Sequence, residues 1–441
     1  MFDLETARNA SSQLPVTSYQ LPTTSFELET GWDRPARSGP EPSQHVLRVR
    51  VRPSARAGSA RGIPLRLAIA LDTSSSMEGD KIAHARSACR AVLAQLRPED
   101  RISLAGFANE VTPLLDRVPG GAEAQAAGDR AASELRAYGV TRAELALDWL
   151  EQALPQEPGT VRLGILISDG RPTDAQGRDI EALGGLLDRA VRLGEAGVAL
   201  CTVGLGDAAN FNTAFLVDLS DRARGAFLYA DSPDGLEPQL RARLAAGQSI
   251  AGAGCRLALR PLLPGVAIKG CCAIRPEFLP LEISGAGDAV SVPLAGLAAD
   301  GPTDLLVSVE APAPGIGDVA GDRPVLAVGL CHGDAGPERE QAASLRYTES
   351  YLEAQRIDAE INRDRLQWEL NVSCWKLNRT TDVKQTAALL EEIAYAAGKA
   401  GQNALAIKAT GQLEALQRGG RLDAHRATGM LVESRRPDGA A

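Results

Sequence analysis

The chain has 441 residues, of which 44% are hydrophobic, and a formal net charge of −9. At roughly 100–200 residues per domain, this length predicts two to four domains, each large enough to bury its own core. The acidic balance argues against a general nucleic-acid binder or a polybasic membrane-surface protein, because both need clustered Lys and Arg. The aromatic content of 4% also argues against stacking platforms for single-stranded nucleic acid.

Signals for export or membrane insertion are not expected in this chain. No apolar run reaches the roughly 18 residues that span a bilayer. The polar stretch Met1–Gln20 contains no apolar core, which argues against a secretory signal peptide. The seven cysteines are scattered without a C-x-x-C pair, which favours reduced thiols, and the four dispersed histidines offer no zinc spacing. These features predict a cytoplasmic protein.

Residues 1–62 are expected to form an N-terminal segment with little regular structure before residue 45, apart from a short strand near Ser25–Glu29. The run Leu47–Arg52 alternates strictly between apolar residues and arginines, which predicts a half-buried strand that joins a later sheet. The arginines of this run continue into the linker at Arg56 and Arg61. We interpret them as a solvated face, with contact to an acidic partner as the alternative.

Residues 63–248 alternate strand and helix, which predicts an α/β domain with a doubly wound, mostly parallel, Rossmann-like sheet. Buried strands are indicated by apolar runs, and helices by apolar residues at spacings of three or four. The predicted strands are Leu65–Leu71, Arg101–Phe107, Val111–Leu115, Val161–Ser168, Val198–Val203 and Ala226–Tyr229. The predicted helices are Gly79–Leu96, Ala122–Leu135, Arg142–Leu154, Ala175–Leu193, Phe211–Ser220 and Leu236–Leu244.

The pattern changes twice in the remainder of the chain. Residues 249–350 contain short apolar runs separated by Pro/Gly turns, which predicts a β-sandwich that includes the strand Leu47–Arg52. Residues 351–441 have helical spacing, with a disordered tail from Arg435. Trp368 and Trp375 fall at helical spacing and are expected in the core of that region.

Oxygen-bearing side chains gather on three loops of the α/β domain. The strand Leu65–Leu71 is followed by Asp72, Ser74 and Ser76, and the strand Val161–Ser168 is followed by Asp169. Thr141 lies between two predicted helices. If the two strands are neighbours, their loops converge at the carboxyl edge of the sheet, where ligands bind in such folds. Hydroxyls and carboxylates without His or Cys suit a hard divalent cation, chiefly Mg²⁺ or Mn²⁺.

This order of residues resembles the metal-ion-dependent adhesion site (MIDAS) of the von Willebrand factor A (VWA) family, over roughly residues 63–245. The resemblance extends to Met77, Phe107, Ser168-Asp169-Gly170, Pro172-Thr173 and Gly204-Leu205-Gly206. It implies that Ser74, Ser76 and Thr141 ligate the metal through hydroxyl oxygens. Asp72 and Asp169 would then act largely through bound water, with Ca²⁺ as a further candidate metal. One departure is Gly139-Val140-Thr141-Arg142, where many relatives have Gly-Gly-Thr-Asn.

The whole arrangement is similar, more loosely, to bacterial relatives of calcium-activated chloride channel and inter-alpha-trypsin inhibitor proteins. It predicts a metal-dependent protein–protein interaction module that is not an enzyme and acts as an intracellular adaptor or scaffold. The cation would bridge to an acidic residue of a partner, and bacterial proteins of this appearance often work with AAA+ ATPases or signalling enzymes.

Other functions have weaker support in the sequence. A metal-dependent hydrolase is the main alternative, but no general base or nucleophile is evident beside the predicted metal. Gly204-Leu205-Gly206-Asp207-Ala208-Ala209 matches a dinucleotide-binding pattern, yet it occurs late in the domain and reads better as a tight turn. His84 is expected to be a helix-surface residue without a catalytic role.

Overall fold

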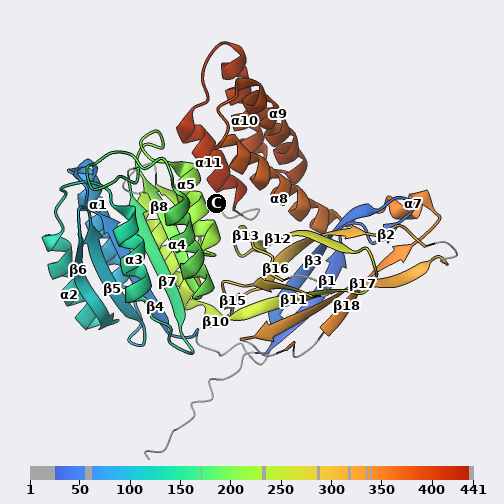
Figure 1. Cartoon of the computed structure of the whole chain (residues 1–441), viewed down its shortest axis with the longest axis horizontal. Coiled ribbons are helices and arrows are strands. Elements are labelled where there is room, and N and C mark those ends of the chain that lie inside the picture. The colour runs from blue at the N-terminus through green and yellow to red at the C-terminus, as the bar shows by residue number, and fades with distance from the viewer. Residues whose placement is uncertain are drawn as a thin grey trace, which may run out of the picture.

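The structure, a computed structural model, describes residues 25–54, 62–169, 171–230, 235–285, 289–315, 319–333, 336–337 and 340–436. Figure 1 shows an α/β region and a β-sandwich side by side, with a group of helices over their junction. The predictions for the first 20 residues, for Arg56 and Arg61, and for the tail beyond Arg436 lie outside the described residues.

The α/β region is built on a six-stranded sheet in the order β6-β5-β4-β7-β8-β9. All neighbours are parallel except β5 and β6, which form an antiparallel pair. β4 and β7 lie at the centre as almost wholly buried apolar runs, because helices cover both of their faces. The strands are β4 (Leu65–Asp72), β5 (Arg101–Phe107), β6 (Val111–Pro119), β7 (Val161–Ser168), β8 (Val198–Leu205) and β9 (Phe227–Ala230).

Helices cover the two faces of this sheet in groups of three. One apolar core lies under α1 (Asp80–Leu93), α2 (Ala122–Glu134) and α6 (Leu236–Gln248). The other lies under α3 (Ala143–Ala153), α4 (Gly184–Glu195) and α5 (Thr213–Arg222). The short 3₁₀ turn η2 (Ser75–Met77) lies between β4 and α1. The predicted doubly wound, mostly parallel sheet is therefore confirmed.

The helix predicted over Ala175–Leu193 is wrong in its first half. The side-chain Oδ1 of Asp174 accepts hydrogen bonds from the backbone N–H groups of Gln176 (2.9 Å) and Arg178 (3.0 Å). This turn uses the backbone groups that would have started a helix, so α4 begins only at Gly184.

The β-sandwich consists of two five-stranded sheets, β1-β3-β16-β12-β13 and β14-β11-β17-β18-β2, which enclose an apolar core. The strand predicted at Leu47–Arg52 is confirmed as part of β3, which pairs antiparallel with β1 and β16. A small two-stranded sheet, β10-β15, lies next to the end of α6. The strands are β1 (Phe26–Trp32), β2 (Ala36–Arg37), β3 (Ser43–Pro53), β10 (Ile250–Gly252), β11 (Cys255–Pro261), β12 (Ala267–Arg275), β13 (Leu279–Leu281), β14 (Val290–Pro293), β15 (Leu297–Ala298), β16 (Thr303–Ala311), β17 (Gly321–His332) and β18 (Glu340–Tyr347).

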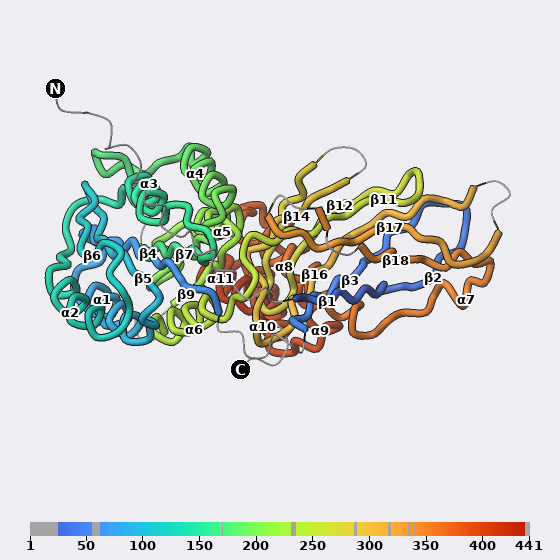
Figure 2. Tube along the Cα trace, turned by 90° about the horizontal axis from the view of Figure 1, so that it is seen from below, coloured from blue at the N-terminus to red at the C-terminus, as the bar shows by residue number. Residues whose placement is uncertain are grey.

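The C-terminal helices pack on both other regions. They are α7 (Tyr351–Ala354), α8 (Ala359–Leu377), α9 (Val383–Ala400), α10 (Asn403–Gln417) and α11 (Ala424–Ser434). Buried residues of α8–α11 share one core with those of α3–α5, and Figure 2 shows α11 next to the α/β region from below. Trp375 is packed against that core, as predicted, and Trp368 against a smaller one beside β12. Arg435 was expected in a disordered tail, but it is buried in a bidentate ion pair with Asp221 of α5 (2.7 and 2.8 Å).

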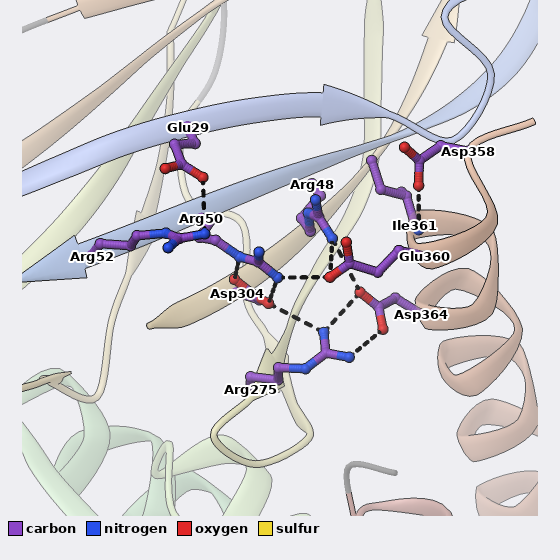
Figure 3. Close-up of polar contacts among 10 residues, drawn as sticks. All are labelled: Glu29, Arg48, Arg50, Arg52, Arg275, Asp304, Asp358, Glu360, Ile361 and Asp364. Atoms are coloured by element: carbon purple, nitrogen blue, oxygen red, sulfur yellow. Dashed lines mark hydrogen bonds and ion pairs between the residues drawn. The ribbon is translucent and has the colours of Figure 1, made fainter. Parts of the chain in front are cut away.

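Two arginines of β3, Arg48 and Arg50, lie against α8 rather than in solvent. Arg50 bonds both oxygens of the buried Asp304 at 2.7 Å, and it reaches Glu360 of α8 at 2.9 Å. Arg48 pairs with Glu360 at 2.7 Å (Figure 3). The interpretation of a solvated face is therefore wrong for Arg48 and Arg50, whose side chains are 15% exposed and bind acidic groups of this same chain.

Candidate metal centre

The carboxyl ends of β4 and β7 lie side by side. These central strands pair in parallel up to Leu71 and Ile167. Asp72 ends β4, and Asp169 follows directly after β7. Sheet topology therefore brings Asp72 and Asp169 to one edge of the sheet. They are far apart in sequence, since Ser168, the residue before Asp169, follows Asp72 by 96 positions.

Hydrogen bonds connect the residues of the first loop to Asp169. The backbone N–H of Ser74 donates to Asp72 Oδ1 at 2.8 Å. The hydroxyls of Ser74 and Ser76 lie 3.0 Å apart, and the Ser76 hydroxyl donates to Asp169 Oδ1 at 2.8 Å. Four of the five predicted site residues thus form one chain of contacts.

Thr141 is held beside these residues by backbone contacts of its loop. The backbone N–H and hydroxyl of Ser75 both donate to the carbonyl of Gly139 at 3.1 Å. On its other side, the carbonyl of Thr141 accepts from the backbone N–H of Thr173 at 2.8 Å. Thr141 is itself 5% exposed. The loop with Thr141 therefore lies between the loops that follow β4 and β7.

The Val140 departure from the family pattern is accommodated by Asn109. The backbone N–H of Val140 donates to Asn109 Oδ1 at 3.0 Å. Gly139 has a φ of +77°, and a Cβ at this position would lie 2.5 Å from the same oxygen. Asn109 and Gly139 therefore fix the loop that presents Thr141.

Asp72 is a fully buried carboxyl without a cationic neighbour among its contacts. Burial raises its pKa to about 6, and the nearby Asp169 adds to the rise. The Ser168 hydroxyl, which donates to Asp72 Oδ2 at 2.7 Å, and the backbone N–H of Ser74 oppose the rise. The carboxyl is held in place by two donors, but its charge is not neutralised.

Asp169 is neutralised by Lys81. The Nζ of Lys81, in the first turns of α1, forms an ion pair with Asp169 Oδ2 and donates to the carbonyl of Ser76 at 3.2 Å. The sequence pattern predicts no role for Ser168 beyond the motif, and none for Lys81. Two features of the sequence could have indicated these residues. Ser168 is adjacent to Asp169, and Lys81 follows Ser76 by five residues.

The donor set fits a hard divalent cation. It consists of two carboxylates and several hydroxyl oxygens, and oxygen ligands of this kind suit Mg²⁺, Mn²⁺ and Ca²⁺. In the described part of the chain, no group of three or more His, Cys, Asp or Glu could hold a metal ion. The described residues therefore contain no cluster of His or Cys side chains that could form a metal site of another kind.

Two other sequence features have structural explanations. At Gly204, a Cβ would lie 2.6 Å from the Phe211 ring, so the glycine allows close packing of this ring and provides no room for a pyrophosphate. The Nδ1 of His84 lies 2.6 Å from the carbonyl of Asp80 on the same helix. All seven cysteines are buried and free of disulfides.

The sheet, the three loops and their residue types define a VWA domain. The family model for the von Willebrand factor type A domain matches residues 67–241. The fold of the whole chain is similar to that of a von Willebrand factor type A protein from Catenulispora acidiphila. The TM-score is 0.78 at 16% sequence identity, and the match covers 96% of this chain and 99% of that one. The shared fold thus includes the sandwich and the C-terminal helices.

Two relatives match parts of the chain in sequence. An uncharacterized protein of Synechocystis sp. is 26% identical over 282 residues, which are 62% of this chain and 63% of that protein. Inter-alpha-trypsin inhibitor heavy chain H4 of Bos taurus is 35% identical over 121 residues, 25% of this chain and 13% of that protein. The chain thus matches less than two thirds of the length of either relative.

VWA domains generally serve as protein-interaction or adhesion modules rather than enzymes, and they often depend on a metal. None of the helices in the described ranges is long and apolar enough to cross a bilayer.

Proposed function

We propose that this protein is a non-enzymatic adaptor or scaffold that binds a partner protein through a divalent cation. Ser74, Ser76 and Thr141 would hold the cation through their hydroxyl oxygens, and Asp72 and Asp169 would act largely through bound water. Mg²⁺ is the favoured ion, with Mn²⁺ or Ca²⁺ as alternatives. The observation that supports this proposal is the chain of contacts from Asp72 through Ser74 and Ser76 to Asp169.

The cation would supply an open coordination position to an acidic residue of the partner. The hydroxyl ligands are neutral, so the cation keeps much of its positive charge. A carboxylate is the hard anionic ligand that fits such a position. As a narrower hypothesis, the partner is an AAA+ ATPase or a signalling enzyme, and the two proteins bind each other in the cytoplasm.

A metal-dependent hydrolase is less well supported by the same contacts. A general base should have a free lone pair directed at a substrate or water. Asp72 is fully buried and accepts hydrogen bonds on both oxygens, and Asp169 accepts from Ser76 and Lys81. Neither aspartate is placed as a free base.

The first experiment measures binding of Mn²⁺ or Mg²⁺ to the purified full chain by calorimetry. Ser74→Ala removes a hydroxyl ligand with little change in volume, and we expect loss of binding with an unchanged circular dichroism spectrum. Glu78→Gln, at an exposed position close to the loop, is the matched control and should bind normally. Normal metal binding by Ser74→Ala would contradict the site assignment.

The second experiment tests the bridge to a partner. Proteins captured from the native host by the wild type should be released by EDTA and should return when Mg²⁺ is restored. Ser74→Ala should fail to capture them, whereas Glu78→Gln should succeed. A partner held equally well by wild type in EDTA and by Ser74→Ala would rule out the metal bridge.

A further inference from the structure

A cavity of about 380 Å³ lies between the VWA domain and the β-sandwich. Val161 at the start of β7, Ala199 near the start of β8 and residues at the end of α6 line one side. Residues of β12 and β13 and of the loop before β16 line the other. A second cavity of about 350 Å³ adjoins it and shares Val161, Ala199 and Arg224. The seam between the domains is therefore hollow at this point.

The walls of the first cavity are mostly apolar on both sides. Its leucines come from β7 on one side and from the sandwich on the other, and its volume falls within the range of small-molecule sites. The leucines that line the cavity are Leu163, Leu279, Leu281, Leu294 and Leu305.

Charges at the cavity are balanced except at Arg224 and at Asp300, whose side chain is exposed to solvent. Arg243 pairs with Glu277 at 2.6 Å, and Arg275 binds both oxygens of Asp364 at 2.8 Å. Arg224 lines both cavities, and its guanidinium makes no hydrogen bond or ion pair with any residue that the structure describes. Burial lowers the pKa of Arg224, and the carboxylates of Glu282 and Glu195 offset only part of that effect. The guanidinium is therefore partly desolvated without a direct counter-charge among the described residues.

The backbone of Arg224 gives an independent sign of a role for its side chain. Its φ is +53°, in the left-handed region, where it ends the turn after α5. Glycine is the usual residue at such a helix end, because a Cβ is strained there. Strained conformations of this kind concentrate at functional sites.

We propose that the seam cavity binds an amphipathic molecule with one anionic head group, which pairs with Arg224 while its apolar body lies among the leucines. A medium-chain fatty acid has this chemistry, and an alkyl phosphate shares it. The site lies at the opposite edge of the sheet from Asp72 and Asp169. β7 runs from one edge to the other, about 23 Å at 3.3 Å per residue. The proposal is thus independent of the metal.

The test titrates the full chain with decanoate, decyl phosphate and decanol by calorimetry. Decanoate and decyl phosphate carry the two anionic head groups, and decanol has the same kind of body without charge. At least one of the anions should bind more tightly than decanol, and the better anion identifies the head group. Equal binding of all three, or no binding of any, would overturn the proposal.

Arg224→Gly separates the head-group contact from folding. The change removes the guanidinium and relieves the left-handed strain, so the ligand-free variant should melt at the same or a higher temperature than wild type. It should bind the preferred anion at least about tenfold more weakly, since hydrogen bonds to a charged group are lost. Arg222→Ala, at an exposed position two residues earlier, is the matched control and should bind normally.

Hydrogen exchange locates the bound anion. Backbone amides at Gly225 and in β13 should become more slowly exchanging when the preferred anion is added to wild type, and not in Arg224→Gly. Full-affinity binding by Arg224→Gly, or protection confined to another part of the chain, would refute this site.

Discussion

The buried carboxylate of Asp72 lowers the stability of the fold in the absence of a metal. The carboxyl is fully buried, and its pKa of about 6 is well above its ordinary value of 3.8. A rise of this size costs the folded state roughly 3 kcal/mol at neutral pH, as an upper estimate. Folding therefore maintains a charged oxygen at a position where a cation would relieve this cost.

We expect Asp72→Asn to stabilise the metal-free protein. The amide keeps an oxygen for the Ser74 N–H, and its NH₂ can donate to the Ser168 hydroxyl in place of the present bond. Urea unfolding in EDTA at pH 8 should show a gain of about 1–3 kcal/mol. Asp116→Asn, at a 70% exposed carboxylate, is the control and should change little.

The pH dependence of this gain follows from the direction of the pKa change. Between the ordinary value of 3.8 and about 6, the folded state binds more protons than the unfolded state at this group. The penalty is complete above pH 6 and is lost as the pH falls toward 4. The advantage of Asp72→Asn should therefore shrink steadily between pH 7 and pH 4, and an advantage that is constant with pH would contradict the assigned cause.

Lys81 should compete with a divalent cation for Asp169. Its ammonium already neutralises this buried carboxylate, and a metal would have to share or displace that contact. Lys81→Met keeps the aliphatic stem and removes the charge, so calorimetric Mn²⁺ affinity should rise by about tenfold, or 1.4 kcal/mol. Lys384→Met on the exposed face of α9 is the control. Unchanged or weaker Mn²⁺ binding by Lys81→Met would show that the lysine does not oppose the metal.

The sequence predicted which residues share the candidate site but not how they are supported. Asp72 and Asp169 follow two strands, and neighbouring parallel strands end at one edge, so their convergence followed from the pattern. The contacts of Ser168 and Lys81 depend on side-chain direction at the sheet edge, which spacing along the chain does not specify.

At the scale of elements, α8 is attached to the sandwich by a network of ion pairs. Asp304 of β16 is wholly buried and accepts from Arg50 of β3 and Arg275 of β12, and Arg275 also binds Asp364 of α8 (Figure 3). Alternation predicted the arginine-bearing strand, but only the packing of α8 shows what the arginines face. Arginine patterns look the same in a sequence whether their partner is water or a distant carboxylate.

Loss of the Asp304 carboxylate should loosen this attachment. Asp304→Ala leaves two partly buried arginines without their shared acid, and we expect a loss of roughly 3 kcal/mol in unfolding free energy. Hydrogen exchange should also accelerate in α8. Arg52→Ala, also on β3, breaks the exposed pair with Glu29 of β1 and should cost below about 0.5 kcal/mol. Similar losses in the two variants would mean that burial does not set the strength of these pairs.

At the scale of the whole molecule, the order of α/β region, sandwich and helices was readable because each has its own hydrophobic period. Periodicity shows which face of an element is apolar but not which other element covers it. Helix α11 illustrates this limit: it lies in the region predicted to be helical, but the sequence did not show that Ala427, Met430 and Leu431 are buried in a core shared with α5. Its contacts with the VWA domain include Thr428 with Thr213 (2.9 Å) and His425 with Tyr229 (2.7 Å).

The ion pair between Arg435 and Asp221 should measure how firmly the helices hold the VWA domain. Both side chains are nearly buried, at 6% and 12% exposure, and they belong to different regions of the chain. Arg435→Met leaves Asp221 without its cation, so we expect a loss of about 3 kcal/mol and faster hydrogen exchange in α11. Arg418→Met breaks an exposed pair within α10 and should have almost no effect. Combining Arg435→Met with Asp221→Asn should cost less stability than the sum of the single changes. Asp221→Asn removes the carboxylate charge that Arg435→Met leaves without its cation. Strictly additive losses would show that Arg435 and Asp221 are not coupled, and that this ion pair does not help to hold the helices on the VWA domain.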